Sequence, residues 1–175
     1  MTKKIRILGG PGAGKSYITH MLREKLKIPA YDLDDIFCCK NTQNYDDRAK
    51  PEVRDAQLKK ILQHKEWIIE GVYGDWTKQT FEQADIILIL QPKTSIRQWR
   101  ILRRFVRRKI LFWQDNRTES LKNFLGLFAW SKKYDRDILQ KIKDDLIVHK
   151  DKMITITKSN INIQDIEKLA KSTST

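Results

Sequence analysis

A glycine-rich octet near the amino terminus constrains the fold of this chain more than any other feature. Residues 9–16 read GGPGAGKS and fit the pattern G-x-x-x-x-G-K-[ST] at every fixed position. An apolar stretch at residues 5–8 precedes the octet, and Ile18, Leu22 and Leu26 follow it with helical spacing. Glycines let backbone N–H groups converge on a phosphate, and the positive end of the next helix faces the same phosphate. The sequence therefore predicts a strand, a phosphate-binding loop and a helix.

This octet, the phosphate loop, predicts a site for a nucleoside triphosphate, which we interpret as ATP bound with Mg²⁺. Lys15 is expected to bridge the β- and γ-phosphates, and Ser16 to offer its hydroxyl to the metal. The alternative is an ordinary glycine turn without a ligand. The residues expected to bind the nucleotide are Gly9, Gly10, Pro11, Gly12, Ala13, Gly14, Lys15, Ser16 and Tyr17.

Short apolar stretches alternate with helical patterns along the rest of the chain. This alternation is typical of a parallel sheet with helices on both faces, so we expect an α/β fold. The strands are expected at residues 5–8, 29–31, 67–69, 85–90 and 153–157. Further helices are expected at residues 51–64, 76–83, 94–109, 133–149 and 162–171.

The length of 175 residues suits a single domain, residues 1–175. No apolar run approaches the roughly 18 residues of a membrane span, and the apolar stretch at 5–8 is too short for a signal peptide. We therefore expect a cytoplasmic protein with no membrane partner. Its two cysteines, Cys38 and Cys39, are adjacent and are interpreted as free thiols.

Acidic residues follow two of the expected strands. Asp32, Asp34 and Asp35 come after the second strand, and Glu70 comes directly after the third. The carboxyl ends of parallel strands meet beside the phosphate loop, so Asp34 or Asp35 is expected to contact the acceptor or the metal. Glu70 lies where an acid that organises the metal would lie. The alternatives are helix capping for the aspartates and a surface turn for Glu70.

The helix expected at residues 94–109 has two unlike sides. One is expected to be apolar, with Ile96, Trp99, Leu102, Val106 and Ile110, and Arg103 lies near its edge. Like charges stacked on the other side repel one another, which favours a negative partner, either ATP or a nucleic-acid backbone. A solvated basic face is the alternative. The arginines of the second side are Arg97, Arg100, Arg104, Arg107 and Arg108.

The net charge of +13 is concentrated in one part of the chain. Residues 93–136 hold 13 Lys and Arg against 3 Asp and Glu, a net charge of +10. Such a segment attracts nucleic acid, an acidic membrane surface or a polyphosphate, although the sequence contains no recognised DNA-binding motif. The aromatic residues nearby could stack on bases or pack within the protein. They are Phe112, Trp113, Phe124, Phe128 and Trp130.

Four segments together resemble the adenylate-kinase-like P-loop kinases, most closely the FlaR-like DNA topology modulation proteins. The segments are ILGGPGAGKS, PAYDLDDIF, WIIEGVYGDW and ADIILILQPKTSIRQWRILRRF, within residues 3–110. The resemblance implies three layers around a five-stranded parallel sheet of order 2-3-1-4-5. It also implies an acceptor-binding segment at residues 34–65 and a mobile lid at residues 105–132.

The same resemblance assigns roles to single residues. Arg100 and Arg104 resemble lid arginines that contact adenine and phosphates, and Glu70-Gly71 resembles an Asp-Gly pair after the third strand. This sequence departs from the pattern at Gly74, where nucleoside monophosphate kinases carry an arginine for the acceptor's phosphate. A monophosphate acceptor is therefore not implied.

Two functions are consistent with these features. The first is a small-molecule kinase in which Lys15, Arg100 and Arg104 stabilise the transferred phosphoryl group. In it, Asp34 or Asp35 positions the acceptor, Glu70 organises the metal, and the lid excludes water. The second is a nucleic-acid-binding regulator that uses ATP as a switch. Simple ATP hydrolysis or nucleotide binding is a further alternative, and the sequence does not identify the acceptor.

Overall fold

A computed structural model of the chain describes residues 3–37, 48–111 and 121–157. Its strands form one five-stranded sheet of order β2-β3-β1-β4-β5, and every pairing is parallel. This arrangement confirms the predicted fold class and strand order. The strands are β1 (Lys4–Gly9), β2 (Ala30–Asp32), β3 (Trp67–Gly71), β4 (Ile86–Leu90) and β5 (Met153–Ile156).

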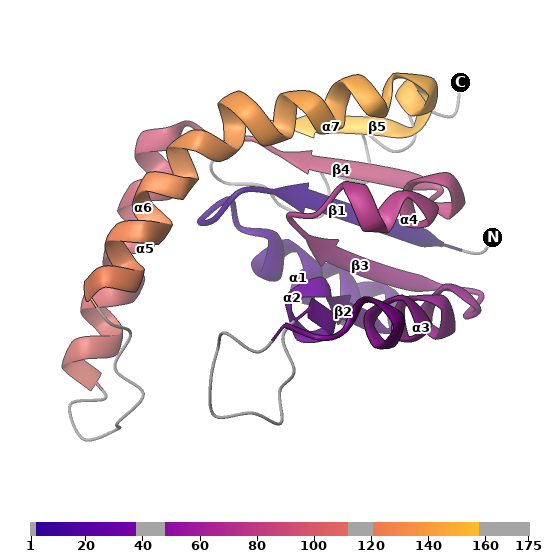
Figure 1. The fold of residues 1–175 in the computed structure, drawn as a ribbon, viewed down its shortest axis with the longest axis horizontal. Coiled ribbons are helices and arrows are strands. Elements are labelled where there is room, and N and C mark those ends of the chain that lie inside the picture. Colours follow the sequence, from indigo (N-terminus) through magenta and orange to yellow (C-terminus); the bar gives the residue numbers. More distant parts are fainter. Residues whose placement is uncertain (1–2, 38–47, 112–120, 158–175) are drawn as a thin grey trace.

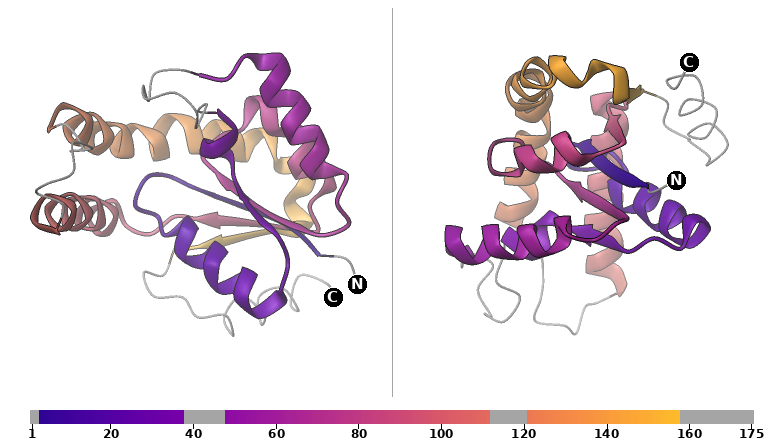
Figure 2. Two further views of the ribbon diagram at one scale, coloured as in Figure 1. Left: turned by 90° about the horizontal axis from the view of Figure 1, so that it is seen from below. Right: turned by 90° about the vertical axis from the view of Figure 1, so that its right-hand side faces the viewer.

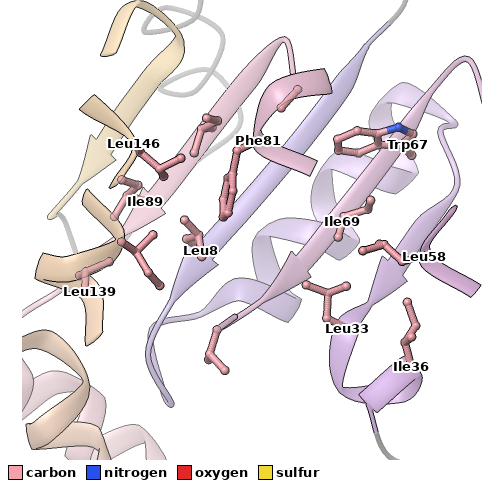
Figure 3. Packing of buried hydrophobic residues seen from close by; sticks show 14 of the residues in the cluster. Leu8, Leu33, Ile36, Leu58, Trp67, Ile69, Phe81, Ile89, Leu139 and Leu146 are labelled. Atoms are coloured by element: carbon pink, nitrogen blue, oxygen red, sulfur yellow. The ribbon is translucent and has the colours of Figure 1, made fainter. Parts of the chain in front are cut away.

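Helices cover both faces of the sheet (Figure 2). Helix α1 (Lys15–Leu26) packs on one face through Ile18 and Leu22, against the side chains of Ile5 and Ile7. The other face carries the larger core, with Leu8, Ile69 and Ile89 from the strands (Figure 3). Alternate residues of each strand therefore serve opposite layers, as continuous apolar strands in a covered parallel sheet do. The helices on this second face are α3 (Pro51–Leu62), α4 (Lys78–Gln83) and α7 (Leu139–Asp145).

Short helical segments complete the connections. Helix α2 (Leu33–Phe37) directly follows β2, and the 3-10 turn η1 (Asp75–Thr77) leads into α4. A second 3-10 segment, η3 (Ile147–Lys152), joins α7 to β5. The short helix expected near residues 76–83 is therefore confirmed as a turn of 3-10 helix and a short α-helix.

Two helices extend away from the sheet as a pair, α5 (Thr94–Leu111) and α6 (Leu121–Lys133) (Figure 1). The ring of Phe105 on α5 stacks on Phe124 of α6 with centroids 4.4 Å apart, and Phe124 contacts Phe128. A π-helical turn, η2 (Tyr134–Ile138), then joins α6 to α7, and Trp130 packs edge-on against Tyr134. The sequence did not predict α6 as a separate helix. Its described aromatic residues pack within the protein.

The buried side of α5 is not the side that carries its predicted apolar stripe. Trp99 is 63% exposed and Val106 is 44% exposed, whereas Arg97 is fully buried and Ile101 is 2% exposed. The side of α5 that carries Trp99 and Val106 is therefore not its buried side. The physical reason is that the base of α5 packs against the phosphate loop. The loop offers glycine backbone at this contact, so the guanidinium of Arg97 can lie directly against it.

Some predictions lie outside the described residues. These are Cys38 and Cys39, the helix at 162–171, and residues 112–120 of the expected lid, which include Phe112 and Trp113. Of Arg108 and Ile110, only the helical backbone is described. Within the described part of the chain, no helix combines the length and the apolar character that crossing a membrane requires.

Candidate functional site

The phosphate loop rises from the middle of the sheet, where β1 lies between β3 and β4. Its turn is closed by a hydrogen bond from the Ala13 amide to the Gly10 carbonyl, with N and O 3.1 Å apart. Gly12 has φ of 74°, a left-handed conformation that favours glycine. Helix α1 begins within the octet, at Lys15, directly after Gly14. The strand, loop and helix that the sequence predicted are thus all present.

Lys15 lies where three acidic groups converge. Burial lowers the pKa of Lys15, and the negative charges of Glu70, Asp34 and Asp32 oppose that shift. Asp32 is the last residue of β2, Asp34 follows in α2, and Glu70 is the next-to-last residue of β3. The register pairs Asp32 with Glu70 across the two strands. The lysine and the acids predicted from distant parts of the sequence therefore share one edge of the sheet.

Ser16 and Glu70 are joined directly. The Ser16 hydroxyl donates a hydrogen bond to Glu70, with Oγ and Oε2 3.3 Å apart. Glu70 is 4% exposed, so it is a buried acid and not one in a surface turn. Burial raises the pKa of Glu70 to about 7, and repulsion by Asp32 adds to the shift.

The donor atoms around Ser16 suit Mg²⁺. A hydroxyl oxygen and carboxylate oxygens are the hard ligands that this ion prefers, and it commonly completes its shell with phosphates and water. Within the described residues, no group of three or more His, Cys, Asp or Glu side chains is arranged to hold a metal. Ser16 and Glu70 would therefore hold Mg²⁺ together with nucleotide phosphates, and not as a preformed cage.

Asp32 caps α2, which separates the roles of the three aspartates. Its Oδ1 accepts a hydrogen bond from the Asp34 amide at 2.9 Å, as an N-cap carboxylate does. Burial raises the pKa of Asp32. Asp34 and Asp35 lie in the first turn of α2 and are exposed. The capping role thus belongs to Asp32, while Asp34 and Asp35 are exposed residues of the first turn.

Asp34 also contacts a residue that the sequence analysis did not identify. The Tyr73 hydroxyl donates a hydrogen bond to Asp34, with the two oxygens 2.8 Å apart. The Tyr73 ring stacks on Phe37 at 5.0 Å and contacts Trp76 at 5.3 Å between centroids. Arg54 of α3 lies over Trp76, 4.5 Å from its centroid. Aromatic rings and an arginine therefore surround the Asp34 edge, within and beside the expected acceptor-binding segment.

The two arginines expected at the nucleotide differ in position. Arg100 donates hydrogen bonds from Nη1 to the carbonyl oxygens of Gly12 and Ala13, at 3.3 and 3.1 Å. Arg104 lies one turn further along α5 and is exposed. Tyr17, also expected at the nucleotide, is 62% exposed at the start of α1. Arg100 is therefore in contact with the phosphate loop, and Arg104 lies farther out on the helix pair.

Arg6, a buried cation on β1, is a residue that the sequence did not lead us to expect near the site. Its Nη2 donates to the Tyr73 carbonyl at 2.9 Å, and its Nε to the Thr80 hydroxyl at 3.2 Å. Its Nη1 donates to the Ile7 carbonyl at 2.8 Å. Burial lowers the pKa of Arg6 to about 10. The signal was present in the sequence, because Arg6 interrupts an apolar strand that was expected to be buried.

Comparisons with known proteins place the fold. No family model matches the chain, and no curated protein matches it. The solved structure of shikimate kinase from Acinetobacter baumannii, in complex with shikimate, matches with a TM-score of 0.52 and 18% identity over 98% of this chain and 94% of that one. A gluconokinase from Sinorhizobium meliloti 1021 matches with a TM-score of 0.54 and 12% identity over 98% and 91%. The chain thus has the fold of small P-loop kinases.

Proposed function

We propose that this chain is an ATP-dependent phosphotransferase that transfers the γ-phosphate to a hydroxyl group of a small acceptor. The observation that carries the proposal is the convergence of Lys15, the Ser16–Glu70 pair and the exposed Asp34 at one edge of the sheet. The likeness in fold to a shikimate kinase and a gluconokinase supports the same class. An ATP-dependent enzyme needs a compartment that supplies ATP, so a cytoplasmic location is part of the proposal.

In the proposed reaction, the acceptor oxygen attacks the γ-phosphorus as the bond to the β-phosphate oxygen breaks, and ADP leaves. Lys15 and Arg100 stabilise the negative charge of the transferred group. Asp34 accepts a hydrogen bond from the acceptor hydroxyl and takes its proton. In the free protein, the same carboxylate accepts a hydrogen bond from the Tyr73 hydroxyl. Bound Mg²⁺ would neutralise phosphate charge beside Ser16 and Glu70. Arg104 makes a secondary contact with the nucleotide from the lid side, and Asp35 makes a secondary contact with the acceptor.

The geometry also favours an acceptor other than a nucleoside monophosphate. A methyl group built on Gly74 would lie 2.7 Å from Cγ1 of Ile142, so α7 fills the space beside that position. Residue 74 therefore has no side chain and is crowded by Ile142, where nucleoside monophosphate kinases carry the phosphate-binding arginine. Membership of the FlaR-like group, which rests on the WIIEG and RQWRILRR segments, is part of this proposal.

The test is a panel of nucleosides, nucleotides, shikimate and sugar acids, incubated with ATP, Mg²⁺ and the purified protein. We expect ADP formation above the acceptor-free rate for a hydroxyl compound without a phosphate group. Lys15→Ala should abolish nucleotide binding, while Lys3→Ala, a change at an exposed lysine, should not. If the protein binds ATP and every acceptor fails, the kinase assignment is wrong; if Lys15→Ala binds ATP normally, the site itself is wrong.

A second candidate is a nucleic-acid-binding regulator that uses ATP as a switch. The observation that favours it is the exposure of Arg103, Arg107 and Trp99 on α5. Binding through phosphate contacts would weaken steeply with salt, in a linear log–log relation. A salt titration of duplex DNA binding, repeated with Arg103→Gln and Arg107→Gln, discriminates the candidates. If the salt dependence of DNA binding has the same slope in both variants as in the wild type, or if no DNA binds at low salt, the regulator candidate is wrong.

A further inference from the structure

Arg97 occupies an unusual place for a charged residue on a helix that extends from the body. Its side chain is fully buried, whereas Trp99, two residues further along α5, is 63% exposed. Its Nη2 donates a hydrogen bond to the Ser131 carbonyl at 2.9 Å and lies 3.5 Å from the Thr94 hydroxyl oxygen. Ser131 is near the end of α6, so the guanidinium joins the bases of α5 and α6.

The same side chain lies against the phosphate loop. A methyl group built on Gly10 would overlap Nη1 of Arg97 and would lie 2.8 Å from Cδ1 of Tyr134. A methyl group built on Gly12 would lie 2.5 Å from the backbone carbonyl oxygen of Arg97 and 3.1 Å from Cγ1 of Ile101. Glycine at both positions is what allows the loop to rest directly on the base of α5.

Tyr134 closes this contact from the side of α6. It is fully buried, and its hydroxyl lies 3.4 Å from the carbonyl oxygen of Val72, the residue after β3. It is also the first residue of the π-helical turn that ends α6, and such turns frequently occur at functional sites. The turn of the phosphate loop at Gly10 is therefore held between Arg97 and Tyr134.

We propose that Arg97 is a positioning residue for the phosphate loop, through which the position of the α5–α6 pair and the binding of nucleotide phosphate are linked. The inference rests on the proposed function, because it takes ATP as the ligand of the loop. Backbone amides bind phosphate only when their N–H vectors converge, so a small displacement of the Gly10–Gly12 turn weakens binding. Since linkage is reciprocal, bound phosphate must in turn stabilise the seating of α6.

The test uses the full-length protein and compares Arg97→Met and Arg97→Lys with Arg103→Met, a matched change at an exposed position of the same helix. ATP affinity is measured by calorimetry, and amide hydrogen exchange is followed at residues 9–13 and 124–134 with and without ATP. In the wild type, we expect ATP to slow exchange in both segments. In Arg97→Met, we expect affinity to fall roughly tenfold, within the usual range of coupling energies. ATP should then slow exchange in the loop alone.

Arg97→Lys should recover part of the affinity, because its ammonium can still donate to the Ser131 carbonyl, and Arg103→Met should behave as the wild type. Wild-type protein that binds ATP without slower exchange at residues 124–134 would overturn the inference even if Arg97→Met fails to fold. Equal ATP affinity in Arg97→Lys, Arg97→Met and the wild type would also overturn it and leave the proposed function intact. Loss of ATP binding in the wild type would overturn both.

Discussion

The hydroxyl of Ser16 and the carboxylate of Glu70 lie 3.3 Å apart, although 53 residues separate them in the chain. Ser16 is the second residue of α1, and Glu70 belongs to β3, the strand beside β1. A hydroxyl that donates to a carboxylate in the free protein can exchange that partner for a metal ion, which both oxygens would then share. The state of this pair should therefore depend on both pH and Mg²⁺.

Glu70 should make the stability of the free protein depend on pH. Burial raises its pKa from 4.5 to about 7, so the folded state holds the proton more tightly than the unfolded chain does. The free energy of unfolding should therefore fall as pH rises through that window, by at most about 3 kcal/mol, and remain reduced above it. Urea unfolding of wild type and Glu70→Gln at pH 5 and pH 8, without nucleotide, measures this difference. Parallel pH dependence in the two proteins would show that Glu70 titrates normally.

Binding of Mg²⁺·ATP should depend on pH in the opposite sense. The ionised carboxylate of Glu70 is the form that holds a cation, so affinity in the presence of Mg²⁺ should rise as pH increases through about 7. In EDTA this rise should be much smaller. Ser16→Ala and Glu70→Gln should each weaken Mg²⁺-dependent binding by about tenfold, which corresponds to ~1.4 kcal/mol. Calorimetric titrations with and without Mg²⁺ check this, and equal losses in EDTA would argue against a metal role.

Much of this arrangement could be predicted because its signals are local. The octet at residues 9–16 specifies a strand, loop and helix by composition, and the apolar run before Glu70 places that acid at a strand end. Parallel pairing then brings the carboxyl ends of the strands together. The proximity of Asp32 and Glu70 could therefore be predicted, although they are far apart in the sequence. The strand order came from the resemblance to a known family and not from periodicity.

The buried arginines could not be placed in the same way. The helical wheel grouped Arg97 with the arginines expected to face a negative partner, because it compares side chains alone and contains nothing about the neighbouring backbone of the phosphate loop. That backbone lies against Arg97, and the Ser131 carbonyl accepts its hydrogen bond. The contact of Tyr73 with Asp34 was also hidden, since it depends on the path of the loop after β3.

Arg100 should support nucleotide binding more than its neighbours on α5 do. It donates to the carbonyl oxygens of Gly12 and Ala13, and hydrogen bonds from a charged donor contribute about 1.5–3 kcal/mol. Arg100→Ala should therefore weaken ATP binding by about tenfold or more. Arg103→Ala, at an exposed position of the same helix, is the matched control and should stay within about twofold. A similar loss in both variants would indicate a general effect of charge and not a contact with the loop.

Asp34 and Tyr73 should matter for the acceptor and not for ATP. Asp34→Asn keeps the size of the side chain but removes the charge that takes the acceptor's proton, so turnover should fall by about 100-fold or more. Tyr73→Phe removes only the hydroxyl that donates to Asp34, and should lower turnover by a smaller factor. Both variants should bind ATP as the wild type does. An assay of ADP formation with the acceptor panel, run beside ATP calorimetry, separates the two effects. Loss of ATP affinity in either variant would contradict this division.

Arg6 should stabilise the fold and the loop after β3 together. Its guanidinium donates to the carbonyls of Ile7 and Tyr73 and lies over the ring of Phe81, 5.2 Å from the centroid. Arg6→Met fills a similar volume but leaves buried carbonyls without a donor, each at a cost of about 1–3 kcal/mol. We expect a loss of about 2–4 kcal/mol in the free energy of unfolding, measured by urea denaturation. Lys4→Met, on the same strand but only partly buried, is the control and should change stability little. A wild-type unfolding midpoint in Arg6→Met would mean that the carbonyls find other donors, and that the cation is not needed to hold Tyr73 in place.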